Sequence, residues 1–124
     1  MTIQNSKFKK EFISRLINFS INIIKFCESL KNERYFLVII DQLLRSSTSI
    51  AANVIEAKSS SSKTEYLRYF QIALKSANET KYWLFIILKT TKNDKNKIIN
   101  QLLKETEEIA NILAAGILTM KGKK

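Results

Sequence analysis

Apolar residues recur at steps of four or three along most of this 124-residue chain. In the first segment the stripe consists of Phe8, Phe12, Leu16, Phe19, Ile23, Phe26 and Leu30. Three later segments carry the same period, which places side chains on one face of an α-helix. The pattern predicts four long helices, near residues 6–30, 33–58, 62–91 and 94–120.

The connections between these segments are short, and the chain has no proline and only two glycines, both near its end. The stretch KSSSSK runs into a capping box in which Ser62 and Glu65 would satisfy free backbone donors at the start of the third helix. Asn32 is expected to cap the second helix, and Asn93 or Asp94 the fourth. Because short connections make consecutive helices antiparallel, we predict an all-α, up-down-up-down four-helix bundle in one domain, residues 1–124, with a basic frayed tail from about 119.

The composition offers little material for catalysis. The chain contains no histidine, which removes the commonest general base and the commonest metal ligand. It has a single cysteine, Cys27, and no glycine-rich phosphate loop. Only two carboxylates, Glu56 and Glu79, could converge inside a bundle, too few for a di-iron site. We therefore predict no enzymatic activity, no catalytic residue, no cofactor and no metal.

The apolar runs at residues 36–40 and 83–88 are far too short to cross a bilayer. The first residues lack the apolar core and cleavage site of a signal peptide. One cysteine, which cannot form an intramolecular disulfide, suits a reducing compartment. The expectation is a cytoplasmic protein with no membrane partner.

The chain carries 21 basic and 11 acidic residues, a net charge of +10. Such a surplus favours polyanionic partners, nucleic acid first. On the third helix a polar stripe suits phosphate contacts with one stacking aromatic, through Arg68, Lys75, Tyr82 and Lys89. The alternative for this stripe is a solvated helix face without a ligand. The alternative function is a protein-interaction scaffold whose positive charge only keeps it soluble.

A second polar stripe lies where a bundle would need apolar side chains. On the second helix it comprises Gln42, Arg45, Ser49, Asn53 and Glu56, and on the third helix Ser76 and Glu79. These residues could form a ligand pocket or a satisfied network that fixes helix register, and we favour the network. In that interpretation Asn53, Glu56, Ser76 and Glu79 are buried and hydrogen-bonded, with Arg45 as the countercharge.

The stretches QLLRSSTSIAANVIEA and IALKSANETKYWL carry a more specific signal. They resemble a bacterial four-helix bundle family that includes proteins encoded in 23S rRNA intervening sequences and the accessory variability determinants of diversity-generating retroelements. The matching positions are Gln42, Arg45, Ser49, Ile50, Asn53, Glu56, Ile72, Ala73, Ser76, Glu79, Thr80, Trp83 and Leu84. Val54 and Ala57 depart from the usual isoleucine and glycine.

The resemblance implies a closed bundle similar to ring-shaped homopentamers. It also implies a basic surface for nucleic acid, and a reverse transcriptase partner if the chain is associated with a retroelement. The first segment independently favours a homo-oligomer, because Ile13, Ile17, Ile24 and Cys27 make its apolar stripe wider than one buried face requires. We therefore predict a non-enzymatic, oligomeric bundle that binds RNA or DNA.

Overall fold

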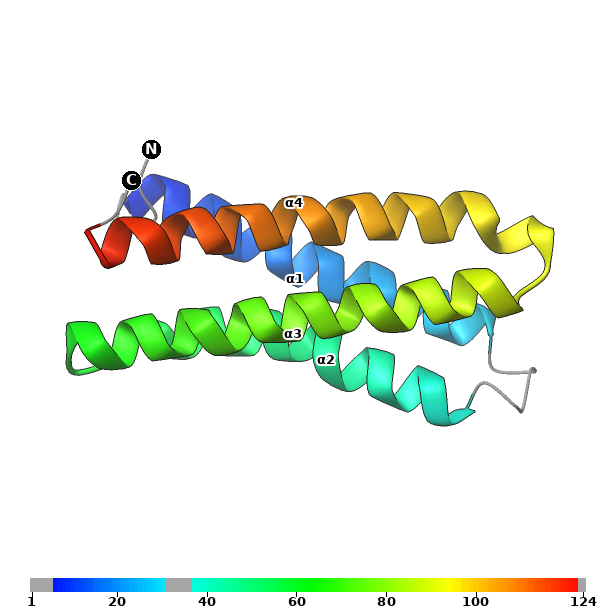
Figure 1. Ribbon diagram of the computed structural model, residues 1–124, viewed down its shortest axis with the longest axis horizontal. Coiled ribbons are helices and arrows are strands. Elements are labelled where there is room, and N and C mark those ends of the chain that lie inside the picture. The colour runs from blue at the N-terminus through cyan, green and yellow to red at the C-terminus, as the bar shows by residue number, and fades with distance from the viewer. Residues whose placement is uncertain (1–5, 31–36, 123–124) are drawn as a thin grey trace.

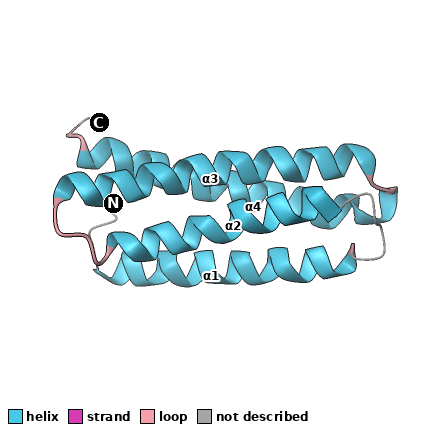
Figure 2. Ribbon diagram, turned by 90° about the horizontal axis from the view of Figure 1, so that it is seen from below, coloured by secondary structure: helices cyan, strands magenta, loops and turns pink. Residues whose placement is uncertain are grey.

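Four long antiparallel helices make up the computed structural model, which describes residues 6–30 and 37–122 (Figure 1). The helices are α1 (Ser6–Ser29), α2 (Leu37–Ala57), α3 (Lys63–Thr90) and α4 (Asn96–Met120), and a short 3-10 turn, η2 (Asn93–Lys95), precedes α4. The described residues contain no strand, and Figure 2 shows the helices running side by side. The predicted all-α four-helix bundle is confirmed.

The start of α3 follows the predicted capping chemistry with one shift. Ser62 is extended, and its hydroxyl accepts a hydrogen bond of 3.1 Å from the backbone N–H of Glu65. The Glu65 carboxylate accepts from the backbone N–H of Ser61 at 2.7 Å, one residue earlier than a standard capping box requires. Two free donors are therefore satisfied where the chain enters α3.

The start of α4 differs from the prediction. Asn93 and Asp94 lie in the 3-10 turn, which the backbone N–H of Lys95 closes by bonding the carbonyl of Lys92 at 3.2 Å. Lys95 becomes the N-cap and makes no side-chain capping bond. The predicted cap at Asn93 or Asp94 is thus wrong, because the tight turn uses these residues before the α-helix begins. The predicted start of the second helix, with its cap at Asn32, lies outside the described residues.

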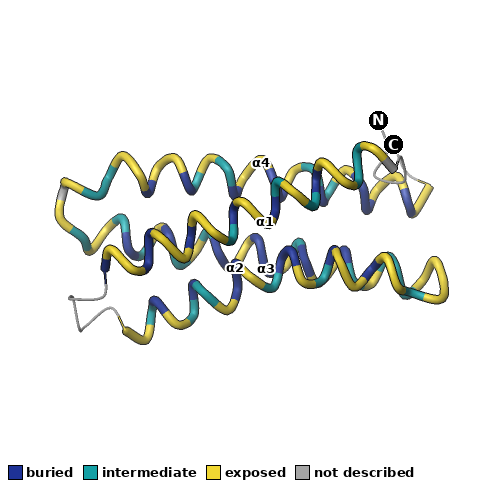
Figure 3. Tube along the Cα trace, turned by 180° about the vertical axis from the view of Figure 1, so that it is seen from behind, coloured by how far each residue is buried: buried dark blue, intermediate teal, exposed yellow. Residues whose placement is uncertain are grey.

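The core is built from one face of each helix, and on α1 this face is the predicted stripe from Phe12 to Leu30. On α3 the buried face is instead shifted from the predicted residues, since Ile72 is exposed while Ala73 is buried. Fully buried side chains include Phe19 of α1, Leu43 of α2, Phe70 of α3 and Ile109 of α4. Figure 3 shows buried positions alternating with exposed ones along each helix, as expected for helices that each bury one face. Of the residues that widen the predicted apolar stripe of α1, Cys27 is buried and Ile13 is half-buried, whereas Ile17 and Ile24 are exposed.

The run from Ser46 to Ser49 does not interrupt α2. The hydroxyls of Ser46 and Ser47 donate to the carbonyls of Leu43 and Leu44, both at 3.3 Å, so they bond within the helix instead of breaking it. The prediction of one continuous helix is confirmed. Among the helices described, none is long and apolar enough to cross a membrane.

The helices do not pack equally. α3 packs extensively against both α2 and α4, whereas α1 packs mainly against α2 and touches α4 at few points. An ion-pair cluster spans that weaker seam: Arg15 Nε lies 2.6 Å from Glu105 Oε2, and Arg15 Nη2 lies 2.6 Å from Glu108 Oε1. The hydrogen bond to Glu105 is the main cause that raises the pKa of the Arg15 guanidinium.

Candidate nucleic-acid interface

The outer face of α3 carries the four residues predicted to contact nucleic acid, which we call the basic strip. Arg68, Lys75, Tyr82 and Lys89 follow one another at intervals of seven and are all exposed. They lie on the side of α3 opposite its buried residues, which include Ala77. At 1.5 Å per residue the strip spans roughly 32 Å along the helix. The structure therefore brings these four side chains to one accessible face.

The cations of the basic strip are not neutralised by acidic partners. In the part of the chain that the structure describes, ion pairs involve only Arg15 and Arg45 among the basic residues. Lys89 instead places its Nζ 5.1 Å from the ring centroid of Phe85. Unpaired ammonium and guanidinium groups on one helix face can contact phosphate oxygens without first breaking an internal ion pair.

Positive charge is concentrated on two of the four helices. α1 and α3 each carry five basic and two acidic residues, whereas acidic residues outnumber basic ones on α2 and α4. α1 and α3 are not neighbours in the bundle, since each packs against α2 and α4. The most basic helices therefore lie across a diagonal of the bundle.

Three residues of the predicted polar stripe meet at the seam between α2 and α3. The Ser76 hydroxyl donates to the Ser49 hydroxyl at 3.0 Å. The Asn53 amide donates to the Ser49 carbonyl and hydroxyl at 2.8 and 2.9 Å. One turn away, the Thr80 hydroxyl donates to the Ser46 hydroxyl at 2.9 Å, and both side chains are buried.

The Ser46–Thr80 pair was not predicted. The helical spacing that singled out Ser49 and Ser76 could have found it, because Thr80 follows Ser76 by four positions and Ser46 precedes Ser49 by three.

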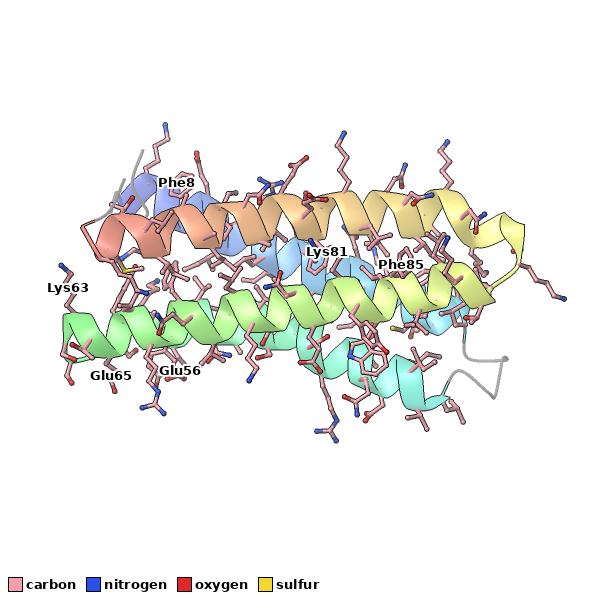
Figure 4. All side chains as sticks on the ribbon, viewed as in Figure 1. Phe8, Glu56, Lys63, Glu65, Lys81 and Phe85 are labelled. Carbon is pink, nitrogen blue, oxygen red and sulfur yellow. The ribbon has the colours of Figure 1, made fainter. Side chains whose placement is uncertain are left out.

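The charged residues of that stripe lie elsewhere. Glu56 and Glu79 are exposed, and Figure 4 shows Glu56 on the outer side of the α2–α3 pair. Arg45 is also exposed, and its Nε–H donates to the Asp41 carboxylate at 2.9 Å, a bond that raises the pKa of the guanidinium. Glu79 only accepts a long bond of 3.4 Å from the indole N–H of Trp83.

The prediction that Glu56 and Glu79 are buried, with Arg45 as their countercharge, is therefore wrong for the single chain. Gln42, at the start of the stripe, is half-buried and contributes no hydrogen bond to the Ser49–Ser76 cluster among the bonds described. The stripe follows the flank of the α2–α3 seam. Short hydroxyls close the seam, while longer carboxylates extend past it into water, which avoids the cost of a buried charge.

A depression beside the basic strip was not predicted from the sequence. An open depression of about 720 Å³ lies between α3 and α4. Its lining comprises Asn78, Lys81, Tyr82, Phe85, Leu103, Lys104 and Glu107. Phe85 looks like part of an apolar run in the sequence, but it lies three positions after Tyr82 and four before Lys89. That spacing places Phe85 on the polar side of α3, and it is the signal that could have revealed the depression.

Comparison with known proteins agrees with this architecture. A sequence profile described as 23S rRNA-intervening sequence protein matches residues 9–115. The crystal structure of a Bacteroides thetaiotaomicron protein of unknown function, from the S23 ribosomal protein family, superposes with a TM-score of 0.77. That protein is 31 % identical in sequence, and the alignment covers 86 % of this chain and 97 % of the other. No protein of curated function matches the sequence. The profile match spans most of the chain, so this protein belongs to the 23S rRNA-intervening sequence protein family.

Proposed function

We propose that this protein is a non-enzymatic bundle that binds nucleic acid, RNA in the first place, through the basic strip. One observation carries the proposal: Arg68, Lys75 and Lys89 share one exposed face of α3 and have no acidic partner among the described residues. The net charge of +10 supports it. The family description, which refers to intervening sequences of 23S rRNA, points to RNA as the first ligand to test.

Contacts of this kind would go to the phosphate backbone. Backbone contacts position a protein on nucleic acid without reading its sequence, so similar affinities for unrelated sequences are expected. Each neutralised phosphate releases counterions. The affinity should therefore fall by roughly 0.9 log unit per log unit of salt for each duplex phosphate contacted.

The same proposal includes assembly into a homo-oligomer. Ile17, Ile21 and Ile24 form an exposed apolar stripe on α1, away from the basic strip of α3. An exposed apolar stripe of this kind usually marks a contact between proteins. The number five rests on the family resemblance alone. Light scattering should give a multiple of the 14.3 kDa chain mass, and a mass of one chain would contradict assembly.

Nucleic-acid binding is tested by fluorescence anisotropy with a structured RNA and a DNA duplex at two salt concentrations. The double reversal Arg68→Glu with Lys75→Glu should weaken binding to both ligands about equally and leave the helical circular dichroism unchanged. The matched control reverses Lys97 and Lys121, which are exposed on or next to α4, so the two variants have the same net charge.

If the control loses as much affinity as the strip variant, the basic strip is not the site. If the wild-type protein binds neither ligand at low salt and micromolar concentration, the alternative function holds. In that alternative the protein is an interaction scaffold, for which the exposed isoleucines of α1 would be the first contact surface.

A further inference from the structure

The depression between α3 and α4 exposes two aromatic rings at the edge of the basic strip. The exposed fractions are 55 % for Tyr82 and 48 % for Phe85. Figure 4 shows Lys81 and Phe85 along the seam between these two helices. Leu103 of α4 forms part of the apolar floor. The rings and this floor are therefore open to a ligand in the single chain.

The core of the bundle does not need either ring. On the same stretch of α3, Leu84 and Ile87 are fully buried and fill the interior. Phe85 has no polar atom that would favour exposure, and such large apolar side chains are usually inside. The ring of Tyr82 is supported by an edge-to-face contact with Trp83, with centroids 4.8 Å apart. The two rings thus form part of a surface rather than of the core.

One ammonium group lies over the Phe85 ring, and two more line the depression. Lys89 Nζ lies 5.1 Å from the centroid of Phe85, and Lys81 and Lys104 line the depression. None of the three lysines has an acidic partner in the described ranges 6–30 and 37–122. Glu107 is the one acidic residue of the lining. Flat apolar rings bordered by unpaired cations match a ligand with flat apolar faces and negative charge.

We propose that Tyr82, Phe85, Lys81 and Lys104, here called the aromatic platform, bind unpaired nucleotides. One base would stack on Tyr82 and another on Phe85, where it would take the place of the Lys89 ammonium, while the lysines contact the adjoining phosphates. This inference rests on the proposed function and narrows its ligand to single-stranded segments, because only unstacked bases offer their faces to a protein. A second copy of this chain suits the platform less well, since it would bring a chain of charge +10 against the lysines.

The test compares a single-stranded oligonucleotide with a fully paired duplex of the same sequence, by anisotropy at constant salt. The ring variant combines Tyr82→Ala with Phe85→Ala, and a gentler variant, Phe85→Leu, retains apolar bulk without the ring. Leu118→Ala is the matched control, because Leu118 is an exposed apolar residue of α4 that does not line the depression. Circular dichroism checks that every variant keeps its helices.

The ring variant should lose about fivefold to a hundredfold in affinity for the single strand, and less than twofold for the duplex. Phe85→Leu should lose affinity in the same direction, and the control should behave as wild type. Quenching of Trp83, the only tryptophan, by the single strand should also diminish in Phe85→Leu.

If the ring variant binds both ligands like wild type, or loses both equally, the platform is overturned. The cations of the basic strip, which the ring variant retains, are tested separately by the charge reversal at Arg68 and Lys75. If wild type binds neither ligand, the proposed function and the platform fail together. If the ring variant lowers the mass measured by light scattering without changing affinity for the single strand, the depression is a contact between copies of the chain. That outcome would also overturn the platform.

Discussion

The Ser76 hydroxyl of α3 donates a hydrogen bond of 3.0 Å to the Ser49 hydroxyl of α2. Together with the bond from Thr80 to Ser46, it ties the two most closely packed helices in one register. A shift of one residue along either helix would break both of these bonds between the helices. Polar groups placed between helices specify register in this way even when their net contribution to stability is small.

Breaking the Thr80–Ser46 bond from one side should be costly. Thr80→Val keeps the shape of the side chain but removes the donor to Ser46, whose hydroxyl retains only its bond to the Leu43 carbonyl. We therefore expect a loss of about 1 kcal/mol in the free energy of unfolding. The measurement is urea denaturation followed by circular dichroism. Adding Ser46→Ala should recover part of the loss, because the buried hydroxyl that lost its donor is then removed. A double variant that is less stable than either single variant would contradict this account.

Glu79→Ala should change stability by less than about 0.5 kcal/mol, the range for exposed substitutions away from structural features. The Glu79 carboxylate is exposed, and its bond to Trp83 is long at 3.4 Å. The measurement is the thermal unfolding of Glu79→Ala compared with that of the wild-type protein. A drop above about 1 kcal/mol would show that Glu79 is buried in the assembled protein.

Arg15→Met should weaken the seam between α1 and α4. The variant retains the apolar stem but removes the bonds of 2.6 and 2.7 Å to Glu105 and the bond of 2.6 Å to Glu108. The Arg15 side chain is 36 % exposed, so solvent screening limits the expected loss to about 1 kcal/mol, and less at high salt. Arg45→Met, which removes an exposed ion pair within one helix, is the control and should unfold like wild type. Equal losses in both variants would contradict a special role for Arg15.

Cys27 should react slowly with thiol reagents at pH 8 in the native protein and rapidly in urea. Burial raises the pKa of this thiol to about 11 from its ordinary 9.0. A raised folded pKa means that folding favours the neutral thiol. The contribution of Cys27 to stability is thus complete below pH 9, declines as the pH rises from 9 to about 11, and is lost above that. Cys27→Ala, measured beside wild type, should lose less stability across that interval. Native labelling as fast as unfolded labelling would refute this.

Helix periodicity was sufficient to predict the fold because each apolar stripe has one way to be buried. The third helix was predicted at 62–91 and lies at Lys63–Thr90, and the fourth was predicted at 94–120 and lies at Asn96–Met120. A stripe does not reveal how a neighbouring helix crosses it. Ser76 and Glu79 share a stripe, yet only Ser76 is covered by α2.

The aromatic platform could not be predicted for a related reason. It requires Lys104 and Leu103 of α4 to lie beside Phe85 of α3, and no single helix pattern contains that pairing. By contrast, the basic strip lies on one helix, so the spacing of its residues was enough to predict their common face.

The unequal packing of the helices has a consequence for how the protein folds. The most extensive packing joins α2 to α3 and α3 to α4, and the helices of each pair are adjacent along the chain. In contrast, α1 and α4 are far apart in sequence and make few contacts with each other. Loop-closure entropy is small for such local pairs, so α2, α3 and α4 should associate quickly and α1 should dock last. α1 would then also be the first helix to detach, and native-state hydrogen exchange should find its amides less protected than those of α3. Equal protection would show that the four helices open as one unit.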